Sequence, residues 1–233
     1  IPGTPEGVPA VEQALYEGIN INITLLFSVA AYEQVAWAYI RALERRLAEE
    51  KPIQSLASVA SFFVSRIDTL ADQWLDEKIE QTTYRSTVEE LKALKGKVAI
   101  ANAKIAYERF QAIFSDARFQ TLQDKGAKVQ RPLWASTSTK NPAYSDVLYV
   151  ETLIGPDTVN TMPLETLAAF RDHGRVQRTV DKDMAAAHQV IRRFEATGCS
   201  LASVTAQVLK EGVEKFDHSL DQLLKLIDAR RGQ

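Results

Sequence analysis

Ile19-Asn20-Ile21-Asn22-Ile23-Thr24-Leu25-Leu26-Phe27 is the stretch that decides the fold. Apolar and polar residues alternate through Thr24, which is typical of a β-strand with one apolar and one polar face. A central strand of a doubly wound sheet is buried on both faces and is continuously apolar. An inward-facing strand end of a (β/α)8 barrel can be polar, because it lines the active site. The stretch therefore favours a barrel strand, and an edge strand with a solvated polar face is the alternative.

The rest of the chain predicts an alternation of strands and helices. Further strands are expected at residues 55–64, 131–135 and 158–162, with a long polar loop at 136–157. The expected helices lie at residues 4–17, 29–50, 68–80, 91–114, 181–196 and 201–229. This order indicates an α/β fold with a parallel sheet. A closed barrel needs eight strands, so we expect residues 1–233 to form a single domain that is the C-terminal portion of a barrel.

The first residues also fit a chain that begins inside a fold. Ile1-Pro2-Gly3-Thr4 is no start site or signal peptide, and it looks like the end of a buried strand that enters a turn. We expect these residues to be the tail of a further strand.

Composition narrows the partners and the compartment. The net charge is −2, so no basic field favours nucleic acid or an anionic membrane, and no apolar run is long enough for a membrane span. Cys199 is the only cysteine, so it cannot form an internal disulfide, and a reducing compartment fits. No histidine pairs with a nucleophile or a second ligand. We expect a cytoplasmic protein, and neither its cysteine nor its histidines predict a metal site.

Three polar residues on the first strand are the first candidate site. Asn20, Asn22 and Thr24 share one face, and their amide and hydroxyl groups suit a ligand with several hydroxyls. The alternative is that they satisfy one another in a polar interior.

The second predicted strand and its end supply the next candidates. Ser61 and Phe63 share one face of the strand, and Arg66 follows its carboxyl end, where barrel loops carry function. The planar guanidinium of Arg66 suits a phosphate, and an ion pair with Asp68 or another acid is the alternative.

Hydroxyls and one lysine follow the third predicted strand. Ser136, Thr137, Ser138, Thr139 and Lys140 form a reasonable phosphate cradle, or an ordinary polar loop. The acidic residues between Asp72 and Glu80 have helical spacing and predict a solvated helix face.

These motifs together resemble the transaldolases. Residues 17–28 resemble the fifth-strand signature of that family, residues 58–68 the sixth strand, residues 131–136 the seventh, and residues 158–163 the eighth. The first two motifs are specific, and the similarity runs in order along nearly the whole chain. The longer bacterial subgroup is the most similar. The resemblance implies a (β/α)8 TIM barrel of the class I aldolase type, of which this chain covers roughly strands 5–8 and the C-terminal helices.

The resemblance also implies an activity and roles for residues. Transaldolases move a dihydroxyacetone unit between sugar phosphates of the pentose phosphate pathway through a lysine Schiff base, without a cofactor. Asn22 resembles the ligand of the dihydroxyacetone hydroxyls, with Asn20 as its neighbour, and Thr24 the residue that positions the catalytic water. The remaining matches are a second hydroxyl ligand, a pocket wall and the phosphate ligands: Ser61, Phe63, Arg66, Ser136 and, as a substitute for the family's second cation, Lys140.

One departure from the family pattern affects activity. The Schiff-base lysine of the family stands immediately before the position that aligns with Ile1, and the lysines of this chain, such as Lys51, Lys78 and Lys92, do not match it. We expect the chain alone to be inactive and to need the missing part of the barrel, or a homodimer. The alternative is a non-catalytic half-barrel that binds phosphosugars.

Overall fold

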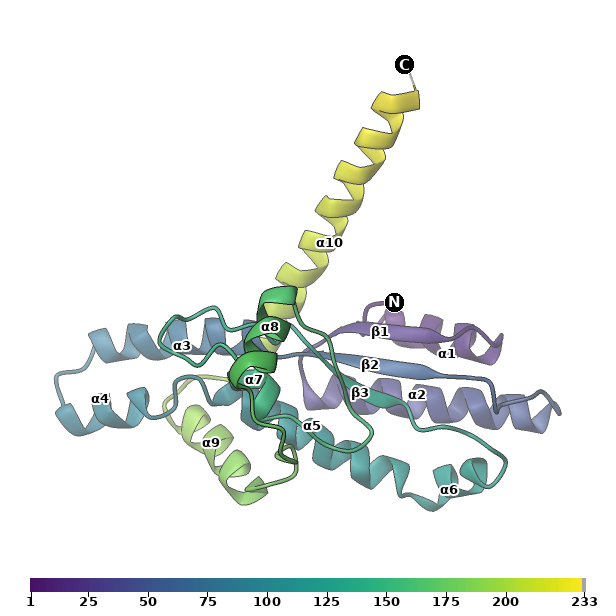
Figure 1. Cartoon of the computed structure of the whole chain (residues 1–233), viewed down its shortest axis with the longest axis horizontal. Helices are drawn as coiled ribbons and strands as arrows, with labels where there is room; N and C mark the ends of the chain where they lie inside the picture. Colours follow the sequence, from purple (N-terminus) through teal and green to yellow (C-terminus); the bar gives the residue numbers. More distant parts are fainter. Residues whose placement is uncertain (232–233) are drawn as a thin grey trace.

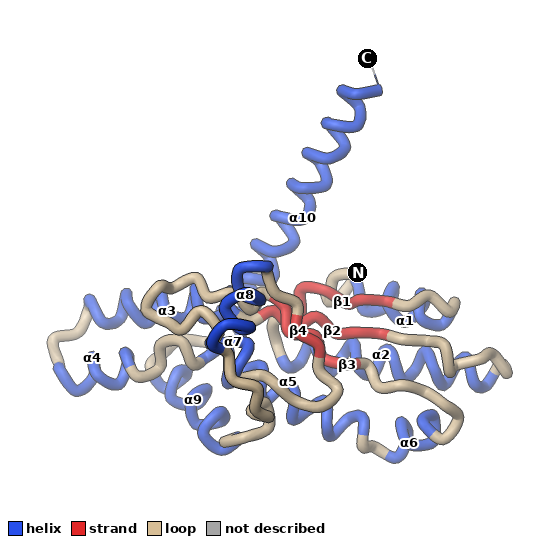
Figure 2. Tube along the Cα trace, viewed as in Figure 1, coloured by secondary structure: helices blue, strands red, loops and turns tan. Residues whose placement is uncertain are grey.

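Four parallel strands form one sheet in the computed structural model, which describes residues 1–231 of the chain (Figures 1 and 2). The strands are neighbours in sequence order: β1 (Ile21–Leu26), β2 (Ser58–Phe63), β3 (Arg131–Ala135) and β4 (Val159–Asn160). The predicted α/β class with a parallel sheet is confirmed.

Helices connect the strands and complete the chain. Ten are described: α1 (Gly7–Tyr16), α2 (Val29–Ala48), α3 (Ser65–Glu80), α4 (Arg85–Lys92), α5 (Val98–Phe114), α6 (Ala117–Gln123), α7 (Leu148–Glu151), α8 (Leu164–His173), α9 (Met184–Ala196) and α10 (Leu201–Arg231). No helix in this described part is both long and apolar enough to cross a membrane.

The two faces of the sheet differ as the alternation of residues 19–27 predicts. Ile23, Ala60 and Trp134 are at most 1% exposed on one face, where α1 and α2 pack against β1 and β2. On the other face Asn22 is exposed. The apolar face thus belongs to the core, and the polar face is left for a ligand or for further protein.

Residues 1–3 lie beside β1, as expected for the tail of a further strand. Pro2 forms a parallel bridge with Thr24, and the backbone N–H of Gly3 donates to Thr24 O over 2.8 Å. The outer edge of β1 is therefore paired near its carboxyl end.

A β-bulge interrupts β1 at the same place. The register shifts between Ile23, which pairs with Ala60, and Leu26, which pairs with Phe62. Leu25 lies in this gap with φ 58°, a left-handed conformation that is unfavourable for a bulky side chain. Bulges often occur beside functional sites, where they change the direction of side chains.

The predicted helix at residues 91–114 is divided in the structure. Gly96, with φ 70°, separates α4 from α5. Two aspartates of α3 bind the backbone at this break, since Asp72 Oδ1 accepts from the Gly96 N–H (3.0 Å) and Asp68 Oδ1 accepts from the Ala99 N–H (2.7 Å). These tertiary contacts satisfy N–H groups at the start of a helix, so the division depends on residues far away in the sequence.

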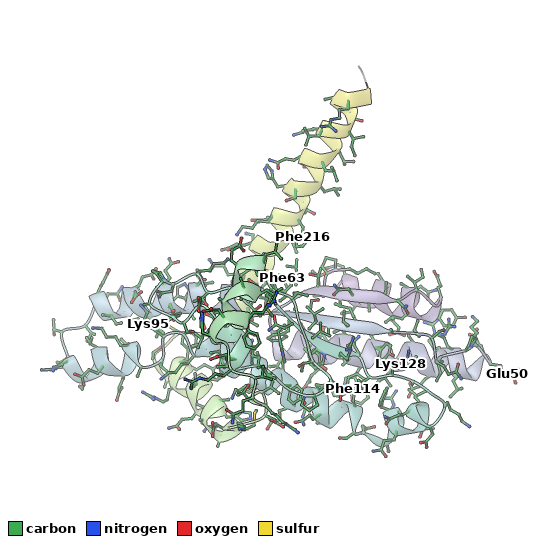
Figure 3. The ribbon with its side chains drawn as sticks, viewed as in Figure 1. Glu50, Phe63, Lys95, Phe114, Lys128 and Phe216 are labelled. Carbon is green, nitrogen blue, oxygen red and sulfur yellow. The ribbon has the colours of Figure 1, made fainter. Side chains whose placement is uncertain are left out.

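The last helix differs from the others in its surroundings. The first part of α10 packs against α3 and β1, and the helix then projects away from the rest of the protein (Figure 1). Six large apolar side chains on its projecting part are about half exposed, namely Phe216, Leu220, Leu223, Leu224, Leu226 and Ile227. Figure 3 shows Phe216 where this projecting part begins. The helix thus presents apolar surface that no described residue covers.

Candidate active site

A direct hydrogen bond joins the polar side chains of β1 and β2. Ser61 Oγ donates to Asn22 Oδ1 over 2.6 Å. Ser61 is buried, whereas Asn22 is exposed. The Asn22 Oδ1 already accepts this hydrogen bond. The Asn22 NH2 group has no partner among the described residues, so it is the part of the amide that can bind a ligand. Two of the predicted site residues therefore form one unit.

Thr24 lies on the same strand, next to residues 1–3. Its backbone N–H donates to Ile1 O (2.9 Å) and its carbonyl accepts from Gly3. The half-buried side chain of Thr24 makes no hydrogen bond within the described part of the chain. Its hydroxyl is thus available next to the segment that pairs with β1.

Asn20 lies apart from this group. It precedes β1, and its Oδ1 accepts from the backbone N–H of Ala57 over 2.8 Å. This contact ties the amino-terminal ends of β1 and β2 together. The structure does not bring Asn20 to the carboxyl ends of the strands, and its role as a substrate ligand stays a prediction.

Phe63 and Arg66 form a stacked pair at the end of β2. The guanidinium carbon of Arg66 lies 5.2 Å from the centre of the Phe63 ring, a distance at which a cation–π attraction acts. The other neighbour of the Phe63 ring is Phe27, at 5.3 Å between centres. Within residues 1–231 Arg66 has no ion pair. The alternative of a pair with Asp68 is wrong, because Asp68 bonds elsewhere.

Ser136 and Lys140 follow β3, as the sequence predicts. Ser136 has a left-handed φ of 56°, and its Oγ shares a hydrogen bond of 2.9 Å with Ser65 Oγ. Lys140 lines one cavity together with Arg66. The structure therefore brings the two predicted phosphate cations to the same hollow.

Thr137 is a supporting residue that sequence reasoning did not separate from its neighbours. It is buried, and its Oγ1 lies 2.8 Å from Asn160 Oδ1 and 3.0 Å from Thr161 O. The contact joins the ends of β3 and β4. Only the position of Thr137 one residue after Ser136 hinted at such a role.

The solvated face predicted for the acidic residues between Asp72 and Glu80 is wrong at Asp72, which is buried together with Asp68 one helical turn earlier. Asp68 is 1% exposed and Asp72 is 7% exposed. The hydroxyl of Tyr149 donates to Asp68 (2.9 Å) and that of Tyr144 to Asp72 (2.5 Å), so the 136–157 connection is fastened to α3. The spacing of four residues between two aspartates on one helix face was the available signal.

Burial controls the ionisation of these aspartates. Desolvation disfavours the carboxylate and raises the pKa of Asp68 to about 7, although the hydrogen bonds from Ala99 and Tyr149 oppose this shift. Desolvation also raises the pKa of Asp72. The hydrogen bonds that fasten the 136–157 connection to α3 therefore depend on pH.

No strand of the described sheet carries a lysine. Burial lowers the pKa of Lys104, the direction that a Schiff-base lysine requires. However, Lys104 is on α5 and not on a strand, and its Nζ donates to the carbonyl of Lys182 (2.8 Å). Lys51 is bound to Tyr16 and Glu49 after α2. Neither residue belongs to the site.

Fold and site together define an α/β protein with a parallel sheet and a polar, cationic site at the carboxyl ends of its strands. A family model described as transaldolase/fructose-6-phosphate aldolase matches residues 1–227, and the chain belongs to this family.

Curated relatives are similar along nearly the whole chain. A transaldolase of Trichodesmium erythraeum (strain IMS101) is 49% identical over 232 residues, which are 99% of this chain and 61% of the relative. Transaldolase 2 of Nostoc sp. (strain PCC 7120 / SAG 25.82 / UTEX 2576) is 50% identical over 233 residues, with 99% and 61% covered. A transaldolase of Frankia alni is 44% identical over 234 residues, with 100% and 61% covered. The chain thus spans 61% of the length of these relatives.

Proposed function

We propose that the whole protein is a transaldolase, and that this chain supplies its substrate-binding strands. The observation that carries the proposal is the hydrogen bond between Ser61 and Asn22 at the end of a polar strand pair. It leaves an amide NH2 free beside hydroxyl groups, an arrangement that suits the hydroxyls of a three-carbon ketose unit. The family membership of residues 1–227 supports the same function.

The proposed reaction is a transfer between sugar phosphates. A lysine amine attacks the ketone of a ketose phosphate such as fructose 6-phosphate, and water leaves as the Schiff base forms. The C3–C4 bond breaks while the Schiff base accepts the electron pair, and an aldose phosphate is released. The remaining enamine attacks the aldehyde of an acceptor such as erythrose 4-phosphate, and hydrolysis frees the product and the lysine.

We assign roles to the described residues on that basis. Asn22 and Ser61 hold the hydroxyls of the dihydroxyacetone unit, and Thr24 positions the water that enters and leaves. Phe63 is a wall of the pocket. Cations bind the phosphate dianion well. Arg66 and Lys140 bind the substrate phosphate, and Ser136 is a neutral ligand of the same phosphate.

We further propose that residues 1–233 are one domain, equivalent to strands 5–8 of a (β/α)8 barrel. The exposed polar face at Asn22 and the apolar side chains on the projecting part of α10 both need cover. The remaining strands of the barrel would provide it, with a homodimer as the other source. A polypeptide of residues 1–233 alone is expected to be inactive, because none of its strands carries a lysine. A cytoplasmic location goes with the proposal, since the only cysteine, Cys199, is an unpaired thiol.

Turnover of fructose 6-phosphate and erythrose 4-phosphate by the complete protein tests the function. We expect activity in the complete protein and a large loss of kcat/KM in Asn22→Ala. The matched control is Asn141→Ala, since the Oδ1 of Asn141 accepts from the backbone N–H of Ala143 within the 136–157 connection. Absence of turnover in the folded complete protein, or full activity of Asn22→Ala, would contradict the proposal.

A further inference from the structure

A cavity lies between α3 and α10, next to the stacked pair of Phe63 and Arg66. Its volume is about 340 Å³. Its lining includes Arg66 from α3, Lys140 from the 136–157 connection, and Gln207, Glu211 and Lys215 from α10. Helix α10 therefore forms one wall of the hollow that contains both predicted phosphate cations.

The charges of the lining suit a dianion. Arg66, Lys140 and Lys215 contribute three positive charges, and Glu211 contributes one negative charge. In the described part of the chain none of these three cations forms an ion pair. Lys140 Nζ donates only to Ser138 Oγ (2.8 Å), and Glu211 accepts from Gln207 (3.0 Å). The net charge of the lining, +2, complements a phosphate monoester, which carries about −1.5 to −2 near neutral pH.

Gly212 lets α10 lie close to Leu25 and Arg66. It is buried in the helix, and a Cβ at this position would lie 3.0 Å from Leu25 Cδ2 and 3.6 Å from Arg66 Nη1. Glycine inside a helix is unfavourable relative to alanine, so a helix interior with glycine indicates a close approach. Leu25 cannot yield easily, because it is 1% exposed and forms the bulge of β1.

We propose that α10 completes the phosphate subsite, with Lys215 as a phosphate-binding cation and Gly212 as the residue that sets the distance of the helix. This inference rests on the transaldolase function proposed above, and it adds residues of α10 to the phosphate site. Lys215 lines the cavity from α10, Arg66 from α3 and Lys140 from the 136–157 connection, so the phosphate would be held between these three segments. No sequence motif predicts this, since Lys215 is about 150 residues away from Arg66 along the chain.

The test compares Lys215→Gln with Lys210→Gln in the complete protein. Lys210 is also exposed on α10, but it does not line the cavity. We expect Lys215→Gln to lower kcat/KM for fructose 6-phosphate roughly tenfold, as for the loss of one charge-assisted hydrogen bond. The value for unphosphorylated fructose and the value of Lys210→Gln should remain within twofold of the wild type. The inhibition constant of inorganic phosphate should rise in parallel with the loss.

Gly212→Ala provides a second variant that retains every charge. It should raise the inhibition constant of inorganic phosphate severalfold, because the added methyl group pushes Lys215 away. An unchanged constant in both Lys215→Gln and Gly212→Ala would overturn the inference.

Arg66→Ala separates this failure from failure of the proposed function. If Arg66→Ala weakens phosphate binding while the α10 variants do not, only the role of α10 is wrong. If Arg66→Ala also has no effect, the phosphate lies elsewhere, and both proposals fail.

Discussion

Ser61 Oγ lies 2.6 Å from Asn22 Oδ1, so the polar side chains of two neighbouring strands hold each other in place. We predict that Ser61→Ala lowers kcat/KM for fructose 6-phosphate roughly fivefold, since about 1 kcal/mol of hydrogen bonding is lost and the Asn22 amide can rotate. Steady-state kinetics of the complete protein measure the change.

Ser58→Ala is the matched control for this prediction. Ser58 is also a buried serine of β2. Its Oγ donates to the backbone carbonyl of Ile21 over 2.9 Å and accepts from Gln130 Nε2 over 3.0 Å. Its removal should lower the free energy of unfolding by about 2–3 kcal/mol, because two hydrogen bonds are lost and the buried Gln130 amide loses its acceptor, and should leave kcat/KM nearly unchanged. Equal kinetics for the two variants would mean that Ser61 has only a structural role.

Phe63→Leu should weaken phosphate recognition without removing a charge. The ring face that attracts the Arg66 guanidinium is lost, which is worth about 0.5–1 kcal/mol at such sites, so we predict a fall of a few fold in kcat/KM for fructose 6-phosphate. The value for unphosphorylated fructose should fall less. Phe62→Leu, on the core face of the same strand, should lower stability and affect both substrates equally.

Asp68 makes stability depend on pH. Its pKa is raised from 3.8 to about 7 in the folded protein, so the protonated form is favoured by folding. This stabilisation is complete below pH 3.8 and is lost as the pH rises through about 7.

Asp68→Asn isolates that contribution. Asparagine can still accept from the Ala99 N–H, and its NH2 group can donate to the Tyr149 oxygen, but it does not ionise. Between pH 5 and pH 7, the free energy of unfolding of the wild type should fall by up to about 1.4 kcal/mol per pH unit relative to this variant. Parallel curves for the two proteins in urea titrations would refute the assignment, and Asp76→Asn, at an exposed position, is the control.

The apolar side chains of α10 should be covered in the complete protein. If the rest of the barrel or a second subunit packs there, Leu220 and Leu223 lose their exposure, which is about half in this chain. Carbene footprinting should label them in a polypeptide of residues 1–233 and spare them in the complete protein. Tyr84, which is 75% exposed at the turn between α3 and α4, should be labelled in both. Equal labelling of the leucines would show that nothing covers the helix.

The sequence predicted the positions of all four strands, although β4 (Val159–Asn160) is shorter than the strand expected at residues 158–162. The prediction for residues 131–135 coincides with β3, and residues 19–27 contain β1 (Ile21–Leu26). The division at Gly96 could not be predicted, because Asp68 and Asp72 bind the backbone there from another helix. Nor could the bulge at Leu25, which is specified by pairing with residues 1–3 and β2.

In the candidate site, too, some features follow from the local sequence, and others follow from contacts between residues that are distant in the chain. Asn22, Ser61 and Arg66 were selected by their positions at strand ends, which the alternation of residues reveals. The wall formed by α10 depends on the packing of Gly212 against Leu25, two residues that carry no chemical signal of their own. Such a packing contact can be identified only from the structure.

The most direct test of the central claim is intact-mass spectrometry, followed by peptide mapping, of the complete protein after treatment with fructose 6-phosphate and borohydride. Our account predicts one covalent adduct with the mass of a reduced dihydroxyacetone unit, on a lysine outside residues 1–233, and a much smaller yield in Asn22→Ala. An unmodified mass for the active, folded protein, or an adduct on a lysine within residues 1–233, would contradict it.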